Sequence, residues 1–230
     1  MSVPVAGGAT TVLASAQAAP TYIVVDATSV YWTNQGTTDD SGAIMSHPIA
    51  AGTAIVLASA QANPLQLVLD GSGNVYWTDY GTSANSFTDG TISMMAVTGG
   101  TVGIVASSQQ APYGIVVGDT GTSLLLIWTN NLDGTVVAAA AAAAAPTTVL
   151  ARNQTSPEGI TIGTEGVYWT DTGSGTIETD PYFGADPTIL ATGQASPSTI
   201  VADASGNLWW ANSGTAANNY TDGSIVKSAP

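Results

Sequence analysis

One short aromatic segment recurs five times along the chain, and it limits the available folds more than any other feature. Each copy has a tryptophan, then Thr or Ala, then Asn or Asp, and it is preceded by β-forming residues. The copies are Ser29–Asn34, Asn74–Asp79, Leu126–Asn130, Gly166–Asp171 and Leu208–Asn212. Val, Tyr, Trp and Thr favour strands, so each copy predicts one β-strand of a repeated unit.

A second motif supports the repeat and sets its period. Two aliphatic residues, Ala, two further residues, Gln, two more residues and Pro occur once per unit. The glutamines lie 40 to 48 residues apart, at Gln17, Gln61, Gln109, Gln154 and Gln194. A period of about 40–50 residues with several short strands is typical of propeller blades.

Each unit is predicted to form four strands, a to d. A nearly continuous aliphatic strand a follows the proline, and the aromatic segment is strand b. A short strand c follows a variable loop, and strand d carries the glutamine motif. We therefore predict one all-β domain over residues 1–230, with repeat units at about 20–61, 64–109, 112–154, 157–194 and 197–230 plus 9–17.

The two ends of the sequence predict how the last blade is completed. Residues 9–16 match strand d, whereas residues 199–228 match strands a to c and have no strand d after them. Pairing the two would complete a fifth four-stranded blade and remove exposed sheet edges. We therefore expect a β-propeller of five blades, the last closed by the N-terminal strand. Two alternatives stay open: the chain is part of a six-bladed propeller, or residues 9–16 pair with a neighbouring molecule.

The repeated tryptophans have two interpretations, as wedges between adjacent blades or as a sugar-binding set. Residues repeated in every blade are explained more economically by packing. We therefore predict that five rings are buried in equivalent places, those of Trp32, Trp77, Trp128, Trp169 and Trp210. The Asn or Asp two residues later is expected to bond backbone N–H groups at the strand end.

Eight consecutive alanines occupy positions 138–145. Their intrinsic propensity favours a helix. The repeat instead places them at the hairpin between strands c and d of the third unit, so the sequence contains a local conflict.

Composition excludes several function classes. The net charge is -14, and Arg152 and Lys227 are the only basic residues. They cannot form a phosphate-binding stripe, so neither nucleic acid nor an anionic membrane surface is an expected partner. The chain has no cysteine, which excludes disulfides, thiolate metal sites and thiol catalysis. Neither a signal peptide nor a segment of 20 apolar residues is visible.

The Tyr-Trp-Thr-Asp segments at Tyr76–Asp79 and Tyr168–Asp171, with Tyr-Trp-Thr-Asn at Tyr31–Asn34, resemble the YWTD class of β-propellers. They are also similar to NHL-type propellers and to secreted bacterial repeat proteins that carry this motif. The resemblance covers essentially the whole chain. It implies an extracellular or cell-surface protein that binds a ligand or acts as a scaffold, and it transfers no catalytic residue.

Loop lengths suggest where a ligand would bind. The b–c loops are long in units five, one and two, which would be consecutive around a closed ring. They carry the binding candidates, three aromatic and four acidic residues: Tyr80, Phe87, Tyr220, Asp39, Asp40, Asp89 and Asp222. Exposed loop aromatics suit a glycan face or a protein partner, but packing against their own loops is an equal alternative. Self-assembly into a surface structure or filament is a further alternative.

Catalytic and metal chemistry have weaker support. The sole histidine, His47, lies in a strand and lacks the partners of a Ser-His-Asp triad. Glu158 follows the proline that begins a strand a, close to the expected central channel, and is the one weak catalytic candidate. Glu158 is the basis of the alternative function, a carbohydrate-active or lyase-type enzyme that uses acidic residues. No cofactor or metal is expected. Converging acidic loops would suit calcium, but this signal is weak because no Asp-x-Asp-x-Asp spacing occurs.

Overall fold

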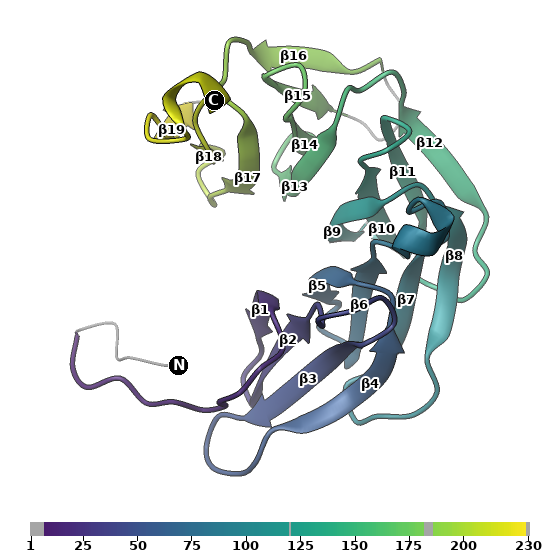
Figure 1. Ribbon diagram of the computed structural model, residues 1–230. Coiled ribbons are helices and arrows are strands. Elements are labelled where there is room, and N and C mark those ends of the chain that lie inside the picture. The colour runs from purple at the N-terminus through teal and green to yellow at the C-terminus, as the bar shows by residue number, and fades with distance from the viewer. Residues whose placement is uncertain (1–6, 120, 182–185, 229–230) are drawn as a thin grey trace.

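The computed structural model describes residues 7–119, 121–181 and 186–228, which form antiparallel sheets arranged around a common centre like propeller blades (Figure 1). We number the sheets as blades 1 to 5 in chain order. Blade 1 contains β1 (Pro20–Val25), β2 (Ser29–Asn34), β3 (Gly42–Pro48) and β4 (Ile55–Gln61). Blade 2 contains β5 (Pro64–Leu69), β6 (Asn74–Asp79), β7 (Gly90–Ala96) and β8 (Gly103–Gln109).

The remaining blades repeat this order. Blade 3 contains β9 (Pro112–Asp119), β10 (Leu124–Asn130), β11 (Thr135–Ala140) and β12 (Thr147–Ala151). Blade 4 contains β13 (Pro157–Gly163), β14 (Gly166–Asp171), β15 (Thr176–Asp180) and β16 (Thr188–Ala191). Blade 5 contains β17 (Pro197–Ala202), β18 (Leu208–Asn212) and β19 (Ser224–Ser228), and short 3-10 helices lie at Ser83–Asn85 and Ala216–Asn218. The strands a (β1, β5, β9, β13 and β17) are innermost, and each contacts the next.

The ring is open, which corrects the prediction of an intramolecularly closed fifth blade. Blade 5 has three strands in the order β17-β18-β19, and no ladder joins Val12–Ala14 to residues 223–228. Residues 7–15 run outward from blade 1, on the other side of the ring opening from blade 5 (Figure 1). The N-terminal segment therefore does not complete the last blade of its own chain.

The five repeated tryptophans are buried, as the sequence predicts. Trp77, Trp128 and Trp169 have no exposed surface, and Trp32 and Trp210 are 7% and 4% exposed. Each inner cluster joins two blades: Trp77 packs with Tyr31 and Ile44 of blade 1. Four rings, those of Trp77, Trp128, Trp169 and Trp210, are buried between adjacent blades, which excludes them as a sugar platform. Trp32 has no preceding blade and is buried beside residues 13–17 instead, so its place is not equivalent to the other four.

The alanine tract forms a hairpin rather than a helix. Ala138 and Ala139 lie in β11, opposite Thr148 and Thr147 of β12, and are 3% exposed. The intervening residues 141–146 contain the turn. Sheet pairing and burial therefore override the helical propensity of alanine.

A buried and a partly exposed tryptophan give a matched stability test. Trp128→Ala is expected to lower the free energy of unfolding by roughly 3–5 kcal/mol, because it leaves a cavity between blades 2 and 3. Trp209→Ala is the control, since this ring is 38% exposed and lies beneath the Lys227 ammonium. Urea unfolding followed by circular dichroism measures both changes. Equal losses in the two variants would contradict the role of Trp128 as a wedge.

Candidate functional site

Threonine hydrogen bonds between blades fix the residues at one end of the central channel. In each of the first four blades, the threonine of the aromatic strand donates a hydrogen bond to the following blade. The acceptor is the backbone carbonyl of the second residue of that blade's strand a, directly after its proline. The four bonds join Thr33 to Leu65 (2.7 Å), Thr78 to Tyr113 (2.8 Å), Thr129 to Glu158 (2.7 Å) and Thr170 to Ser198 (3.0 Å). Consecutive blades therefore present Tyr113 and Glu158 at equivalent places beside the channel.

Three aromatic rings gather next to Glu158. Tyr80 follows β6, and its ring centroid lies 5.1 Å from that of Phe87 and 6.4 Å from that of Tyr113. Tyr80 and Tyr113 meet nearly edge to face, a favourable arrangement for aromatic pairs. Burial, followed by the nearby charge of Glu158, raises the pKa of both phenols. We call Tyr80, Phe87, Tyr113 and Glu158 the mouth cluster.

Glu158 is the acidic member of the mouth cluster. Partial burial raises its pKa, and the negative charge of Asp171 adds to this, although a hydrogen bond with Thr172 opposes it. Asp171 is itself held by the backbone N–H groups of Thr155, Ser156, Gly173 and Ser174. Both oxygens of Asp171 are occupied by these bonds, so it is poorly placed to act as a second catalytic group.

A cavity of about 270 Å³ lies beside the mouth cluster, with which it shares one lining residue, Tyr113. Its polar lining includes Tyr22, Gln66, Tyr113, Ser198 and Thr199. The Gln66 amide donates to the Tyr22 hydroxyl (3.0 Å), and its oxygen accepts the Ile115 N–H (3.2 Å). This end of the channel therefore presents phenols, hydroxyls and an amide.

The other end of the channel is apolar. A second cavity, of about 400 Å³, is lined by side chains further along the strands a, Val24, Val25, Val68, Leu69, Val116, Val117 and Ile162. The polar chemistry is thus confined to the end where the b–c and d–a loops lie.

Most of the acidic residues predicted as binding candidates hold loops in place. Asp39 accepts from the Asn63 amide (3.0 Å) and from the Ser83 backbone N–H (2.9 Å), which links the loops of blades 1 and 2. Asp89 accepts from Thr82 and Asn85, and Asp222 accepts from Thr215 and Asn218 in the same way. The Asn218 and Thr215 bonds lower the pKa of Asp222 to about 2. Asp40 is exposed and has a positive φ of 60°.

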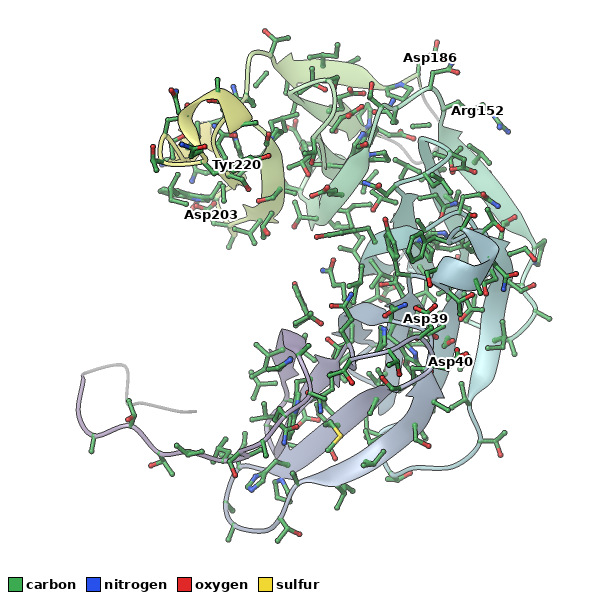
Figure 2. The ribbon with its side chains drawn as sticks, viewed as in Figure 1. Asp39, Asp40, Arg152, Asp186, Asp203 and Tyr220 are labelled. Atoms are coloured by element: carbon green, nitrogen blue, oxygen red, sulfur yellow. The ribbon has the colours of Figure 1, made fainter. Side chains whose placement is uncertain are left out.

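The aromatic candidates separate into two places. Tyr80 and Phe87 lie together in the mouth cluster, whereas Tyr220 is 60% exposed on blade 5. Figure 2 shows Tyr220 across the ring opening from Asp39 and Asp40. The loops of units one and two are joined through Asp39, whereas the loop of unit five is separated from them because the ring is open.

Sequence reasoning missed Tyr113, Tyr22 and Gln66. They lie in strands a, whose aliphatic runs predict burial on both faces. The available signal is position: each is the first or second residue after a strand-a proline, where the strand faces the channel mouth.

Metal and triad chemistry find no support in the described residues. These residues contain no group of three His, Asp or Glu side chains able to hold a metal ion. His47 is buried near the end of β3, and its Nδ1 lies 2.6 Å from the Pro48 carbonyl oxygen. That end of β3 is opposite the b–c loop, so His47 is remote from the mouth cluster.

The Asn or Asp that ends each aromatic strand has three different roles. Asn34, Asn130 and Asn212 donate to the glutamine of the preceding repeat motif, at 2.9, 3.2 and 3.1 Å. Only Asp171 shows the predicted bonding to backbone N–H groups. Asp79 accepts from the Trp77 indole and from the Thr91 and Ser93 hydroxyls, and its other oxygen has no partner. Burial raises the pKa of Asp79 to about 7, although these hydrogen bonds oppose the shift.

The raised pKa of Asp79 predicts that the free energy of unfolding depends on pH. A carboxyl that has a higher pKa in the folded protein than in the unfolded chain binds its proton more tightly when folded, so stability falls as pH rises from about 4 through 7. Asp79→Asn, the residue used in three other blades, is expected to remove this loss, on the order of 1–3 kcal/mol between pH 5 and pH 8.

Thermal unfolding at pH 5 and pH 8 measures the effect. Asp171→Asn is the matched control, and it should destabilise at both pH values because its carboxylate accepts four backbone N–H bonds. A wild-type melting temperature that is flat, or that rises, between pH 5 and pH 8 would contradict the assignment to Asp79.

Comparisons with known proteins agree on the fold and go no further. No family model matches the chain, and no curated protein matches its sequence. One similar solved structure is the nidogen/laminin complex, with a TM-score of 0.68 and 20% identity over 91% of this chain and 74% of that chain. Another is a catalytically inactive His-to-Ala variant of virginiamycin B lyase from Staphylococcus aureus with quinupristin, with a TM-score of 0.71 and 19% identity over 95% and 73%. A streptogramin B lyase structure has a TM-score of 0.67 and 18% identity over 93% and 69%. The chain therefore has a β-propeller fold that is found in both binding proteins and lyases.

Proposed function

We propose that this chain is a non-enzymatic extracellular propeller, a single domain over residues 1–230, that binds a neutral glycan in the cavity beside the mouth cluster, with Tyr113 at their junction. The observation that carries the proposal is the lining of the 270 Å³ cavity, where Tyr22 and Tyr113 lie beside the Gln66 amide and the Ser198 and Thr199 residues. Small-ligand sites combine apolar and aromatic walls with a few polar groups that orient the ligand.

The exposure of Tyr113 supports contact with a ligand. Its ring is 37% exposed although it is held on the innermost strand of blade 3, and Tyr80 and Phe87 pack beside it. Aromatic faces suit the C–H faces of a sugar, and the phenol supplies a polar tip. The net charge of -14 repels anionic ligands, which favours a neutral glycan.

An extracellular or cell-surface location belongs to the same proposal. The chain carries 26 glycines and only two basic residues, and the YWTD-like segments are typical of extracellular propellers. No helix in the described part of the chain is long and apolar enough to cross a membrane.

The binding proposal is tested with Tyr113→Ala. A glycan array identifies a ligand for the wild-type protein, and titration calorimetry then compares variants. Loss of the central ring is expected to weaken binding about tenfold or more, whereas Tyr220→Ala, which removes an exposed aromatic residue on blade 5, should bind like wild type. If the array is silent and a pulled-down protein instead depends on Tyr113, the ligand class is wrong and the face is a protein-binding site.

The second candidate is a carbohydrate-active or lyase-type enzyme. Its support is Glu158, a partly buried carboxyl whose pKa is raised mainly by burial. Turnover of a polysaccharide or streptogramin B panel by wild type, abolished in a folded Glu158→Gln variant, would favour it. Turnover that survives Glu158→Gln would exclude Glu158 as the acid or base.

A further inference from the structure

The two blades beside the ring opening each expose a face that is buried everywhere else. Ile23 of β1 is 60% exposed, whereas its four equivalents are nearly inaccessible, Leu67, Ile115, Ile160 and Ile200 at 0 to 3%. Ile225 of β19 is 76% exposed, whereas Ile44, Ile92, Val136 and Ile177 at the same place are fully buried. In the inner blades, residues at these two positions pack in the same clusters, as Ile44 does with Leu67. The exposed face of β19 and the exposed face of β1 therefore correspond to the two sides of the contact that strand c of one blade makes with strand a of the next.

The segment before blade 1 already has the geometry of the end of a strand d. The Gln17 amide donates to the Ser15 carbonyl (2.9 Å), as Gln61 does to Ser59 (2.7 Å). The Gln17 oxygen accepts the Trp32 indole N–H (2.9 Å), as the Gln61 oxygen does from Trp77 (2.9 Å). Residues 15–17 therefore lie on blade 1 as the end of a strand d lies on the following blade.

The turn that follows is also formed. The Ala18 and Ala19 carbonyls accept the backbone N–H groups of Gly36 and Gln35, at 3.0 and 2.9 Å. Ala62 and Asn63 make the same bonds to Gly81 and Tyr80 between blades 1 and 2. Thr11 forms an isolated β-bridge, but no strand c lies beside residues 12–15 among the described residues.

No strand of the described residues pairs with the outer edge of β19. In blade 1, strand c pairs with strand d so that Ile44 is opposite Ala58 and Met45 is opposite Val56. Ala211 is opposite Ile225 in blade 5, as Thr33 is opposite Ile44 in blade 1. The register of the missing pair is therefore Ile225 opposite Ala14 and Val226 opposite Val12.

The edge of blade 5 differs from the other blades at one position and is separated from the N-terminal segment of its own chain. Ala211 stands where the other four blades have the threonine that donates to the next blade. At this position blade 5 therefore has no hydroxyl for the Thr21 carbonyl, whether blade 1 belongs to the same chain or to a second copy. In this chain the edge of blade 5 and residues 7–15 lie on opposite sides of the opening (Figure 1). Residues 7–15 extend away from the ring, where a strand from another molecule can reach them.

We propose that residues 11–15 of one copy pair with β19 of a second copy as the fourth strand of blade 5, so that copies join head to tail. Addition of a strand to an open sheet edge is a common mode of recognition. Residues 7–19 carry no charged side chain, so the donated strand adds no repulsion between acidic copies. The two surfaces are different, which makes the contact heterologous and able to propagate into a filament. The inference uses the ring opening and is independent of the mouth cluster.

Engineered disulfides test the pairing and its register, because the chain has no cysteine of its own. Ala14→Cys and Ile225→Cys are made separately, one with a mass tag, and mixed under mild oxidation. Opposite residues of an antiparallel pair lie within bridging distance, so the tagged–untagged dimer should form about fivefold or more above a Ser205→Cys control mixed with the same partner. Ser205 is exposed in the turn between β17 and β18.

The double variant Ala14→Cys/Ile225→Cys separates the remaining outcomes. A ladder of disulfide-linked oligomers supports pairing between copies. A single faster-migrating monomer means that the chain closes on itself and overturns the proposal. Absence of both products, in variants that keep the wild-type circular dichroism spectrum, means that another segment or no segment covers β19 and also overturns it.

Discussion

The hydrogen bond from each threonine to the next blade is the interaction on which this structure depends. Thr129, for example, accepts the Gly114 N–H of its own blade (3.0 Å) and donates to the Glu158 carbonyl of the following blade (2.7 Å). Its hydroxyl is buried and satisfied on both sides, as buried polar groups must be. One residue thus sets the distance between the innermost strands, the depth of the tryptophan beside it and the place of the residue at the channel mouth.

Much of the fold could be predicted from the sequence because the repeat encodes it. The period fixed the blades, and burial of the tryptophans followed from their recurrence. The alanine tract shows why the period was the stronger signal: a helix would leave β10 and β12 without the strand that pairs with both. Closure was predicted wrongly because counting strands shows which edges are complementary but not whether they meet.

The candidate site was less predictable because its members are identical in type to structural residues. Asp89 and Asp222 end matching Thr-x-x-Asn-x-x-x-Asp loops, and this repetition marks them as loop-forming carboxylates. Tyr113 and Glu158, by contrast, differ from the residues at their equivalent positions, Thr21, Leu65 and Ser198. In a repeat protein the shared residues build the frame, whereas the residues that vary at one structural position are free to carry a function.

Phe87 and Tyr220 show how the ring opening changes the meaning of an exposed side chain. Both lie at the same place in matching loops, with φ of 61° and 57°, a conformation that bulky residues rarely adopt. Phe87 packs on Tyr80, and its carbonyl accepts the Ala111 N–H from the turn before blade 3 (2.9 Å). The residue equivalent to Ala111 for Tyr220 is Ala19, which also has a positive φ but lies beyond the opening. The exposure of Tyr220 therefore has the same origin as that of Ile225: both belong to a blade interface whose other half is carried by the N-terminal segment and blade 1.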